Sequence, residues 1–255
     1  MSTVALHHVQ DGPRDAPLLV LGPSLGANVS MWSSQAAALS DAFRVVRYDH
    51  RGHGGSPAPP GPYEIADLGR DVLGLLDALG AGRVHLGGLS LGGMVAMWVA
   101  IHAPERVDRI VLCCTSARLG PPEMWRDRAR RVRGEGLAAV APPVVERWIS
   151  PAGHAADPER TRRLEAMLAA NDPEGYASCC GAIERMDLTG ELAAIRAPAL
   201  VIGAAGDLAT PPAEHAARIA AAIPGARLEV LEGAAHMANL ERPDAVTELM
   251  REHLR

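Results

Sequence analysis

The stretch HLGGLSLGG, residues 85–93, places one nucleophilic hydroxyl, that of Ser90, among four glycines. Its central five residues read Gly-Leu-Ser-Leu-Gly, the pattern G-x-S-x-G. In this pattern the serine occupies a strained turn between a strand and a helix, and glycine avoids side chains that would collide there. A serine hydroxyl is a weak nucleophile, so attack on a carbonyl also needs a base and an acid that orients the base.

Both partners occur downstream, each directly after a predicted strand. The strand PALVIGA is followed by AGDLATPP, which contains Asp207, and the strand RLEVLE is followed by GAAHMANLERP, which contains His236. The chain order Ser, Asp, His is that of α/β-hydrolases. Taken alone, an aspartate before Thr-Pro-Pro is commonly a turn residue and a lone histidine is usually solvated. Together with the glycine-rich turn, they predict a catalytic triad of Ser90, Asp207 and His236.

The oxyanion of an acyl-transfer intermediate needs two backbone N–H donors. One is predicted to be the amide of Leu91, the residue after the nucleophile. The second is expected from the loop LGPSLGANVSMW, where position favours Leu25. This loop has Pro-Ser where His-Gly is common in the fold, so Ser24 either assists the oxyanion or holds the turn, and the turn is favoured.

Other interpretations of the glycines meet the wrong spacing. A phosphate-binding P-loop needs Lys and then Ser or Thr after its last glycine, whereas Gly92 is followed by Gly93 and Met94. The dinucleotide pattern G-x-G-x-x-G is absent after the first strands, and a structural Gly-Ser turn remains the alternative. The histidines lack partners at metal-ligand spacing. The sequence therefore predicts no cofactor and no metal.

Short apolar runs alternate with stretches of helical period, which predicts an α/β fold with a mainly parallel sheet flanked by helices. The chain is expected to open with an antiparallel hairpin, because TVALHHV and PLLVLG flank the turn-rich QDGPRDA. Buried strands are then expected at FRVVRYD, RVHLGG, RIVLCCT, PALVIGA and RLEVLE. Residues 117–194 contain no strand-like run. They are predicted to form a helical cap inserted into an α/β-hydrolase core of residues 1–116 and 195–255.

Composition limits the class of partner. The net charge is -5 and no long basic run occurs, which argues against a nucleic-acid surface. No apolar stretch approaches the roughly 18 residues of a membrane span. The cysteines form two adjacent pairs, Cys113-Cys114 and Cys179-Cys180, which fit buried thiols better than a disulfide framework. A cytoplasmic protein acting on a small molecule is expected.

Several segments resemble the 3-oxoadipate enol-lactonases, namely LGPSLGANVSMW, VVRYDHRGHGGSP, HLGGLSLGGMVAMW, EGYASCCGAI and GAAHMANLERP. The resemblance implies hydrolysis of 3-oxoadipate enol-lactone to 3-oxoadipate through an acyl-enzyme, a step of the β-ketoadipate pathway of aromatic compound degradation. In some bacteria this hydrolase is joined to a decarboxylase domain. The resemblance thus implies fusion or association with a carboxymuconolactone decarboxylase domain.

The implied substrate carries a free carboxylate, which a pocket should meet with a fixed cation. The predicted cap is rich in arginine near its start, and most of these side chains are expected on a solvated helix face. Arg133, beside a glycine, and Trp148, in ERW, are the substrate-binding residues chosen on this basis.

Other functions on the same scaffold remain open. Carboxylesterases, cofactor-free perhydrolases and peptidases that act on an N-terminal residue share the triad. Haloalkane dehalogenases and epoxide hydrolases are disfavoured, because their elbow carries aspartate where this chain has Ser90. A small-molecule receptor with little catalysis also remains an alternative, since a fold does not determine function.

Overall fold

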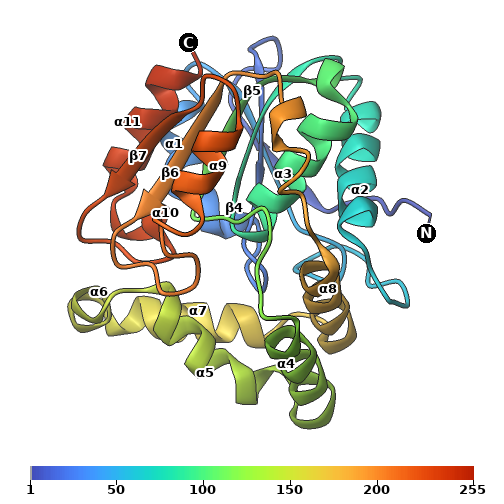
Figure 1. Cartoon of the computed structure of the whole chain (residues 1–255), viewed down its shortest axis with the longest axis vertical. Helices are drawn as coiled ribbons and strands as arrows, with labels where there is room; N and C mark the ends of the chain where they lie inside the picture. The colour runs from blue at the N-terminus through green and yellow to red at the C-terminus, as the bar shows by residue number, and fades with distance from the viewer. Residues whose placement is uncertain (1) are drawn as a thin grey trace.

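The computed structural model describes residues 2–255, and within them seven strands form one sheet (Figure 1). The spatial order is β1-β3-β2-β4-β5-β6-β7, with β1 antiparallel to β3 and every other neighbouring pair parallel. Strands buried on both faces are typical of such a sheet, because helices cover each side. The strands are β1 (His8–Asp11), β2 (Leu18–Gly22), β3 (Arg44–Tyr48), β4 (Val84–Leu89), β5 (Val107–Cys113), β6 (Ala199–Ala204) and β7 (Arg227–Leu231).

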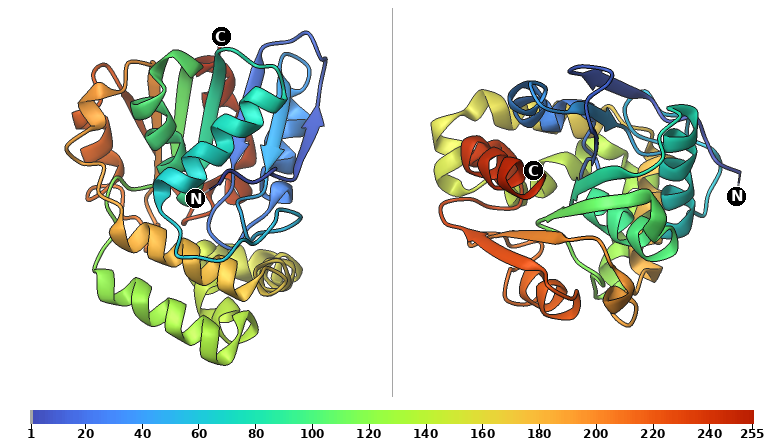
Figure 2. Two further views of the ribbon diagram at one scale, coloured as in Figure 1. Left: turned by 90° about the vertical axis from the view of Figure 1, so that its right-hand side faces the viewer. Right: turned by 90° about the horizontal axis from the view of Figure 1, so that it is seen from above.

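Helices pack on both faces of the sheet (Figure 2). One face carries α1 and α11, which contact each other, and the other carries α2, α3 and α9. In α2 the apolar residues recur every three or four positions and are buried, as the sequence predicts. The α/β-hydrolase architecture is therefore confirmed. The flanking helices are α1 (Ser33–Leu39), α2 (Ile65–Ala78), α3 (Leu91–His102), α9 (Ala216–Ala222), the short α10 (Ala238–Glu241) and α11 (Pro243–His253).

Five helices follow one another between β5 and β6 in the described chain, without an intervening strand. They form a separate layer beyond one end of the sheet, below it in Figure 1 and in the left view of Figure 2. Residues of this layer and residues that follow β4 line a common cavity, so the layer lies over the carboxyl ends of the strands. The helices are α4 (Pro122–Glu135), α5 (Leu137–Trp148), α6 (Pro151–Ala156), α7 (Pro158–Ala169) and α8 (Pro173–Arg185).

The predicted opening hairpin is wrong. Strand β1 pairs antiparallel with β3, with His8 opposite Tyr48, while β2 lies on the far side of β3. The turn-forming residues between β1 and β2 indicate that the chain reverses direction there, but they do not determine which strand β1 pairs with. Burial decides the pairing, because the mostly buried β2 needs a parallel neighbour on each side whereas the half-exposed β1 suits an edge.

Strand β7 forms where the sequence predicts it, but it is not a buried strand. It is the last strand of the sheet and pairs only with β6. Leu228 and Val230 are 36% and 42% exposed. The apolar run therefore predicts the strand correctly, but it does not show that β7 is an edge strand with one side open to solvent.

Two further observations concern the predicted class of protein. All four cysteines are buried free thiols, as expected from their occurrence as two sequence-adjacent pairs. Between residues 2 and 255, the search for a helix with the length and hydropathy of a bilayer span finds none.

Candidate active site

Ser90 lies at the sharp turn between β4 and α3, with φ 56° and ψ −116°. Positive φ is strained for a residue with a Cβ, so the surroundings must hold this conformation. The Ser90 amide donates to the Cys113 carbonyl at 3.0 Å, and the Thr115 hydroxyl donates to the Ser90 carbonyl at 2.6 Å. Strand β5 and its following loop thus fix the serine backbone.

Glycine is required on both sides of this turn because the backbone closes on itself. A Cβ on Gly88 would lie 2.1 Å from the carbonyl carbon of Gly92. A Cβ on Gly92 would lie 2.2 Å from the carbonyl oxygen of Gly22 in β2. These neighbours are main-chain atoms, which cannot move aside as a flexible side chain can. The glycines of the G-x-S-x-G pattern therefore bring β2, β4 and α3 into contact around Ser90.

Substitution Gly92→Ala is expected to lower the free energy of unfolding by about 3 kcal/mol, because the added methyl overpacks a main-chain contact. The matched control is Gly134→Ala on α4, where an added Cβ meets nothing within 4 Å. That change is expected to stabilise the protein by about 0.5–1 kcal/mol. Urea unfolding of both variants measures the difference, and equal effects would contradict the role given to Gly92.

Asp207 and His236 form a buried pair in the loops after β6 and β7. His236 Nδ1 lies 2.9 Å from Asp207 Oδ2, and the two side chains are 3% and 0% exposed. Asp207 also accepts from the Ala209 amide at 2.8 Å and from the Thr210 amide and hydroxyl at 2.9 and 2.6 Å. Burial alone would raise the pKa of Asp207, but the His236 charge and these hydrogen bonds hold it well below its usual range. The ionised carboxylate accepts a hydrogen bond from Nδ1–H of His236, so the other ring nitrogen, Nε2, is left unprotonated and can act as a base.

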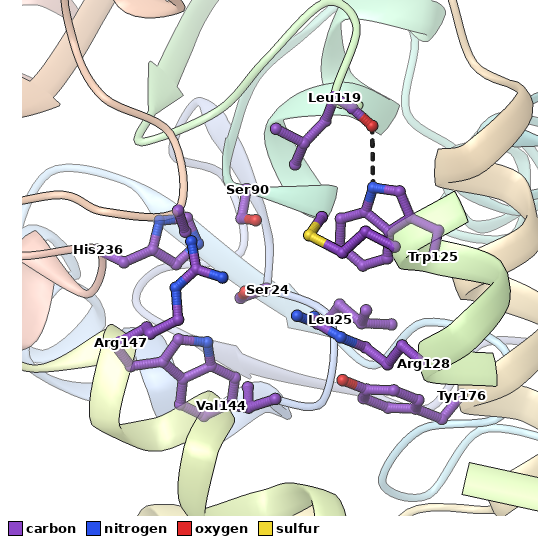
Figure 3. Close-up of a pocket in the computed structure, with 13 residues that line it drawn as sticks. Ser24, Leu25, Ser90, Leu119, Trp125, Arg128, Val144, Arg147, Tyr176 and His236 are labelled. Atoms are coloured by element: carbon purple, nitrogen blue, oxygen red, sulfur yellow. Dashed lines mark hydrogen bonds between the residues drawn. The ribbon is translucent and has the colours of Figure 1, made fainter. Parts of the chain in front are cut away.

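Ser90 and His236 line one cavity beneath the helical layer, and Figure 3 shows the two side chains as neighbours there. The structure thus brings the three residues of the predicted triad together. Of the other residues selected from the sequence, Ser24, Leu25 and Trp148 also line this cavity.

The predicted oxyanion donors come from two segments, the start of α3 and the loop after β2. Leu91 is the first residue of α3, and the first amides of a helix have no partner within it. Leu25 belongs to the loop after β2 and lines the cavity. This loop is held through the Pro23 carbonyl, which accepts from the Gly92 amide and from His50 Nε2, both at 2.9 Å.

The cation expected from Arg133 is absent from the cavity wall. The guanidinium of Arg133 binds the Glu174 carboxylate at 2.6 and 2.7 Å and lines a different surface depression. Arg128 and Arg147 line the cavity in its place. Residues 128 and 133 differ by about 140° around a helix of 3.6 residues per turn, so one helix directs them to different surroundings.

Sequence reasoning missed Arg128 and Tyr176, yet the sequence carried a signal for the arginine. In α4 the buried residues are Trp125, Ala129 and Val132, a stripe at helical spacing. Arg128 lies on this stripe, three residues after Trp125. The position of Tyr176 depends on how α8 packs against α4, which no local pattern reports.

His50, one of two adjacent buried histidines, supports the loop that carries Leu25 through the Pro23 carbonyl. His50 and His53 are each 1% exposed, and their ring centroids lie 6.1 Å apart. Burial and then the His53 charge lower the pKa of His50 to about 3, against a rise from the Pro23 carbonyl. Burial lowers the pKa of His53 to about 4, opposed by the Arg51 carbonyl and nearby aspartates. Both rings are neutral in the folded protein at neutral pH.

The free energy of unfolding is expected to fall by several kcal/mol as the pH drops from about 6.5 towards 4. Folded His50 and His53 have lower pKa values than unfolded histidine, so the unfolded chain binds more protons in this window. The contribution of the two neutral histidines to the free energy of unfolding is fully present above pH 6.5. Urea unfolding across the pH range checks this, with His50→Gln as the comparison because glutamine can donate to the Pro23 carbonyl without titrating. Parallel curves for both proteins would exclude His50 as a source.

A search of residues 2–255 for three or more His, Cys, Asp or Glu side chains placed to hold a metal ion finds no such group.

Comparison with known proteins identifies the family. The model of the alpha/beta hydrolase fold family matches residues 17–135. The chain is 41% identical to 3-oxoadipate enol-lactonase 2 of Acinetobacter baylyi, covering 95% of this chain and 90% of that protein. It is 33% identical to 3-oxoadipate enol-lactonase 1 of the same organism, with 92% and 87% covered.

A solved structure agrees with these relatives. The crystal structure of the enol-lactonase from Burkholderia xenovorans superposes with a TM-score of 0.96 at 45% identity, covering 98% of this chain and 96% of that one. The matched part of the chain is nearly its whole length, so it includes the sheet and the helical layer. The chain therefore belongs to the 3-oxoadipate enol-lactonase family of α/β-hydrolases.

Proposed function

We propose that this chain is a serine hydrolase that opens 3-oxoadipate enol-lactone to 3-oxoadipate, a step of the β-ketoadipate pathway of aromatic compound degradation. One arrangement carries the proposal: Ser90 on its strained turn shares a cavity with His236, whose Nδ1 is held by buried Asp207. Similarity to the enol-lactonases supports the choice of substrate within the hydrolases.

Acylation of Ser90 is the first half of the proposed reaction. The Ser90 hydroxyl attacks the lactone carbonyl while His236 Nε2 takes its proton, and Asp207 stabilises the imidazolium. The amides of Leu25 and Leu91 donate to the oxyanion. The ring C–O bond then breaks, and His236 returns the proton to the leaving oxygen. The released enol tautomerises to the ketone while its chain stays attached to Ser90 as an ester.

Hydrolysis of this ester is the second half. Water attacks the acyl carbon, and His236 Nε2 takes a proton from the water. The same two amides hold the second oxyanion. Collapse of the intermediate returns the proton to Ser90 and releases 3-oxoadipate. The carbonyl that was attacked leaves as a carboxylic acid, which releases its proton to solvent, so the product carries one more negative charge than the substrate.

The helical layer is proposed to act as a cap, residues 117–194, on a core of residues 1–116 and 195–255. Support comes from the cavity lining, in which Ser90 and His236 belong to the core while Trp125, Trp148 and Tyr176 belong to α4, α5 and α8. In this division the core performs the reaction and the cap selects the substrate. A cytoplasmic location is proposed with it, supported by the four buried free thiols. An association with a carboxymuconolactone decarboxylase domain is proposed on the resemblance to the enol-lactonases.

The test is consumption of the enol-lactone, generated in situ and followed in the ultraviolet, with 3-oxoadipate identified as the product. Rapid turnover by the purified chain is expected. Hydrolysis of aryl esters without turnover of the lactone would instead indicate a carboxylesterase. Tight retention of the lactone with little turnover would indicate a receptor.

A further inference from the structure

We infer that Arg128 and Tyr176 form a carboxylate-binding subsite in the cavity, on the side away from His236. The inference rests on the proposed function, because it assigns these residues to the free carboxylate of the lactone. In that substrate the carboxymethyl group is attached to the ring carbon that bears the leaving oxygen. The carboxylate therefore projects away from the carbonyl that Ser90 attacks, into the part of the cavity that the cap encloses.

Charge pairing on α4 distinguishes Arg128 from its neighbours. Four other arginines of this helix each bind a carboxylate, and none of the four is among the residues that line the cavity. Their partners are Glu123 and Glu184 for Arg126, Asp127 for Arg130, Glu135 for Arg131 and Glu174 for Arg133. Within residues 2–255, no acidic side chain lies within ion-pair distance of Arg128, which is half-buried on the cavity wall. An anionic ligand would supply the missing partner.

The guanidinium of Arg128 is positioned before any ligand arrives. Its central carbon lies 4.7 Å from the ring centroid of Trp125, a cation–π geometry. The Trp125 ring is itself held, because its Nε1 donates to the Leu119 carbonyl at 2.8 Å (Figure 3). A guanidinium resting on an anchored ring loses less freedom when it binds a carboxylate.

Tyr176 supplies a second indication of a ligand at the same end of the cavity. Its side chain is fully buried, and within the described chain its hydroxyl oxygen makes no hydrogen bond of normal geometry, although the Arg128 guanidinium lies close enough to lower its pKa. Buried polar atoms without a partner are uncommon. Figure 3 shows this hydroxyl directed into the cavity beside the Arg128 guanidinium. Burial raises the pKa of Tyr176 above its usual range, so the hydroxyl keeps its proton and can donate to an anion.

Arg147, the other arginine of the cavity, has a different environment. It donates to the Leu208 carbonyl in the loop that also carries Asp207. Figure 3 places it on the same side of the cavity as His236. A carboxylate bound there would lie at the reacting end, where the substrate presents its ester. The geometry therefore favours Arg128 over Arg147.

The experiment compares two lactones that differ in the carboxylate alone. One is 3-oxoadipate enol-lactone, and the other is 5-methylfuran-2(3H)-one, which has the same ring with a methyl in place of the carboxymethyl group. Arg128→Gln is expected to lower kcat/KM for the anionic lactone by about 10²-fold, mostly through KM, and for the neutral lactone by less than threefold. Tyr176→Phe is expected to give a selective loss of about tenfold. Arg130→Gln, on the outer face of α4, is the matched control and should change neither rate.

Activity with the neutral lactone also reports that each variant is folded. Equal losses on both lactones, or no loss on the anionic one, would overturn the subsite while leaving the proposed function intact. Failure of the unsubstituted chain to consume the anionic lactone would overturn the proposed function and the subsite together.

Discussion

Substitution Ser90→Ala is expected to lower kcat for the enol-lactone by about 10⁴-fold or more. The Ser90 hydroxyl oxygen forms the ester bond of the acyl-enzyme. In the alanine variant, water would have to attack the lactone carbonyl directly, without a covalent intermediate. His236→Ala should cost a similar factor, because the hydroxyl then loses its proton acceptor. Groups that act as one unit are not additive, so the double variant should be about as slow as either single variant. Steady-state rates of the three variants measure this.

Ser116→Ala is the matched control for this prediction. Ser116 is also buried, and its hydroxyl lies 2.8 Å from Nδ1 of His215, so the structure holds a Ser–His hydrogen bond at another place. That pair lines a different depression, between the loop after β5 and α9. Activity within about threefold of the unsubstituted chain is expected for this variant. A large loss for Ser116→Ala together with a small loss for Ser90→Ala would refute the assigned nucleophile.

Substitution Asp207→Asn is expected to lower kcat by about 10³–10⁴-fold with little change in stability. One oxygen of the carboxylate accepts from the Ala209 and Thr210 amides, so the asparagine oxygen must keep that position. The asparagine NH₂ then faces His236 Nδ1 and donates to it. The imidazole proton is forced onto Nε2, which can no longer accept the proton of Ser90.

Asp187→Asn serves as the control for this substitution, since Asp187 accepts from the amide and hydroxyl of Thr189 in a comparable turn but lies away from the cavity. Its kcat should be unchanged. Urea unfolding of both variants separates a tautomer effect from a loss of fold. If Asp207→Asn retained most of the activity, Asp207 would not be the residue that orients His236.

Local chemistry in the sequence was sufficient for the parts of the site that depend on one turn or one strand end. The spacing of Gly88, Ser90 and Gly92 predicts a strand, a strained turn and a helix, because few other residues tolerate that backbone. Asp207 and His236 could be selected because each follows an apolar run of strand length. The carboxyl ends of parallel strands lie at the same edge of a sheet, so the loops that follow neighbouring strands lie close together.

Strand order, edges and side-chain partners were decided by the tertiary structure. The turn before β2 is compatible with a hairpin, yet β3 lies between β1 and β2 because β2 buries more surface with a parallel neighbour on each side. Dependence on tertiary packing also explains why the sequence did not identify the arginine that lines the cavity. Arg128 and Arg133 belong to one arginine-rich helix. The apolar stripe of α4 includes Arg128, but it is the packing of α4 against α8 that pairs Arg133 with Glu174 and leaves Arg128 facing the cavity. Sequence patterns report the periodicity of one element, whereas the partner of a long charged side chain depends on atoms contributed by another.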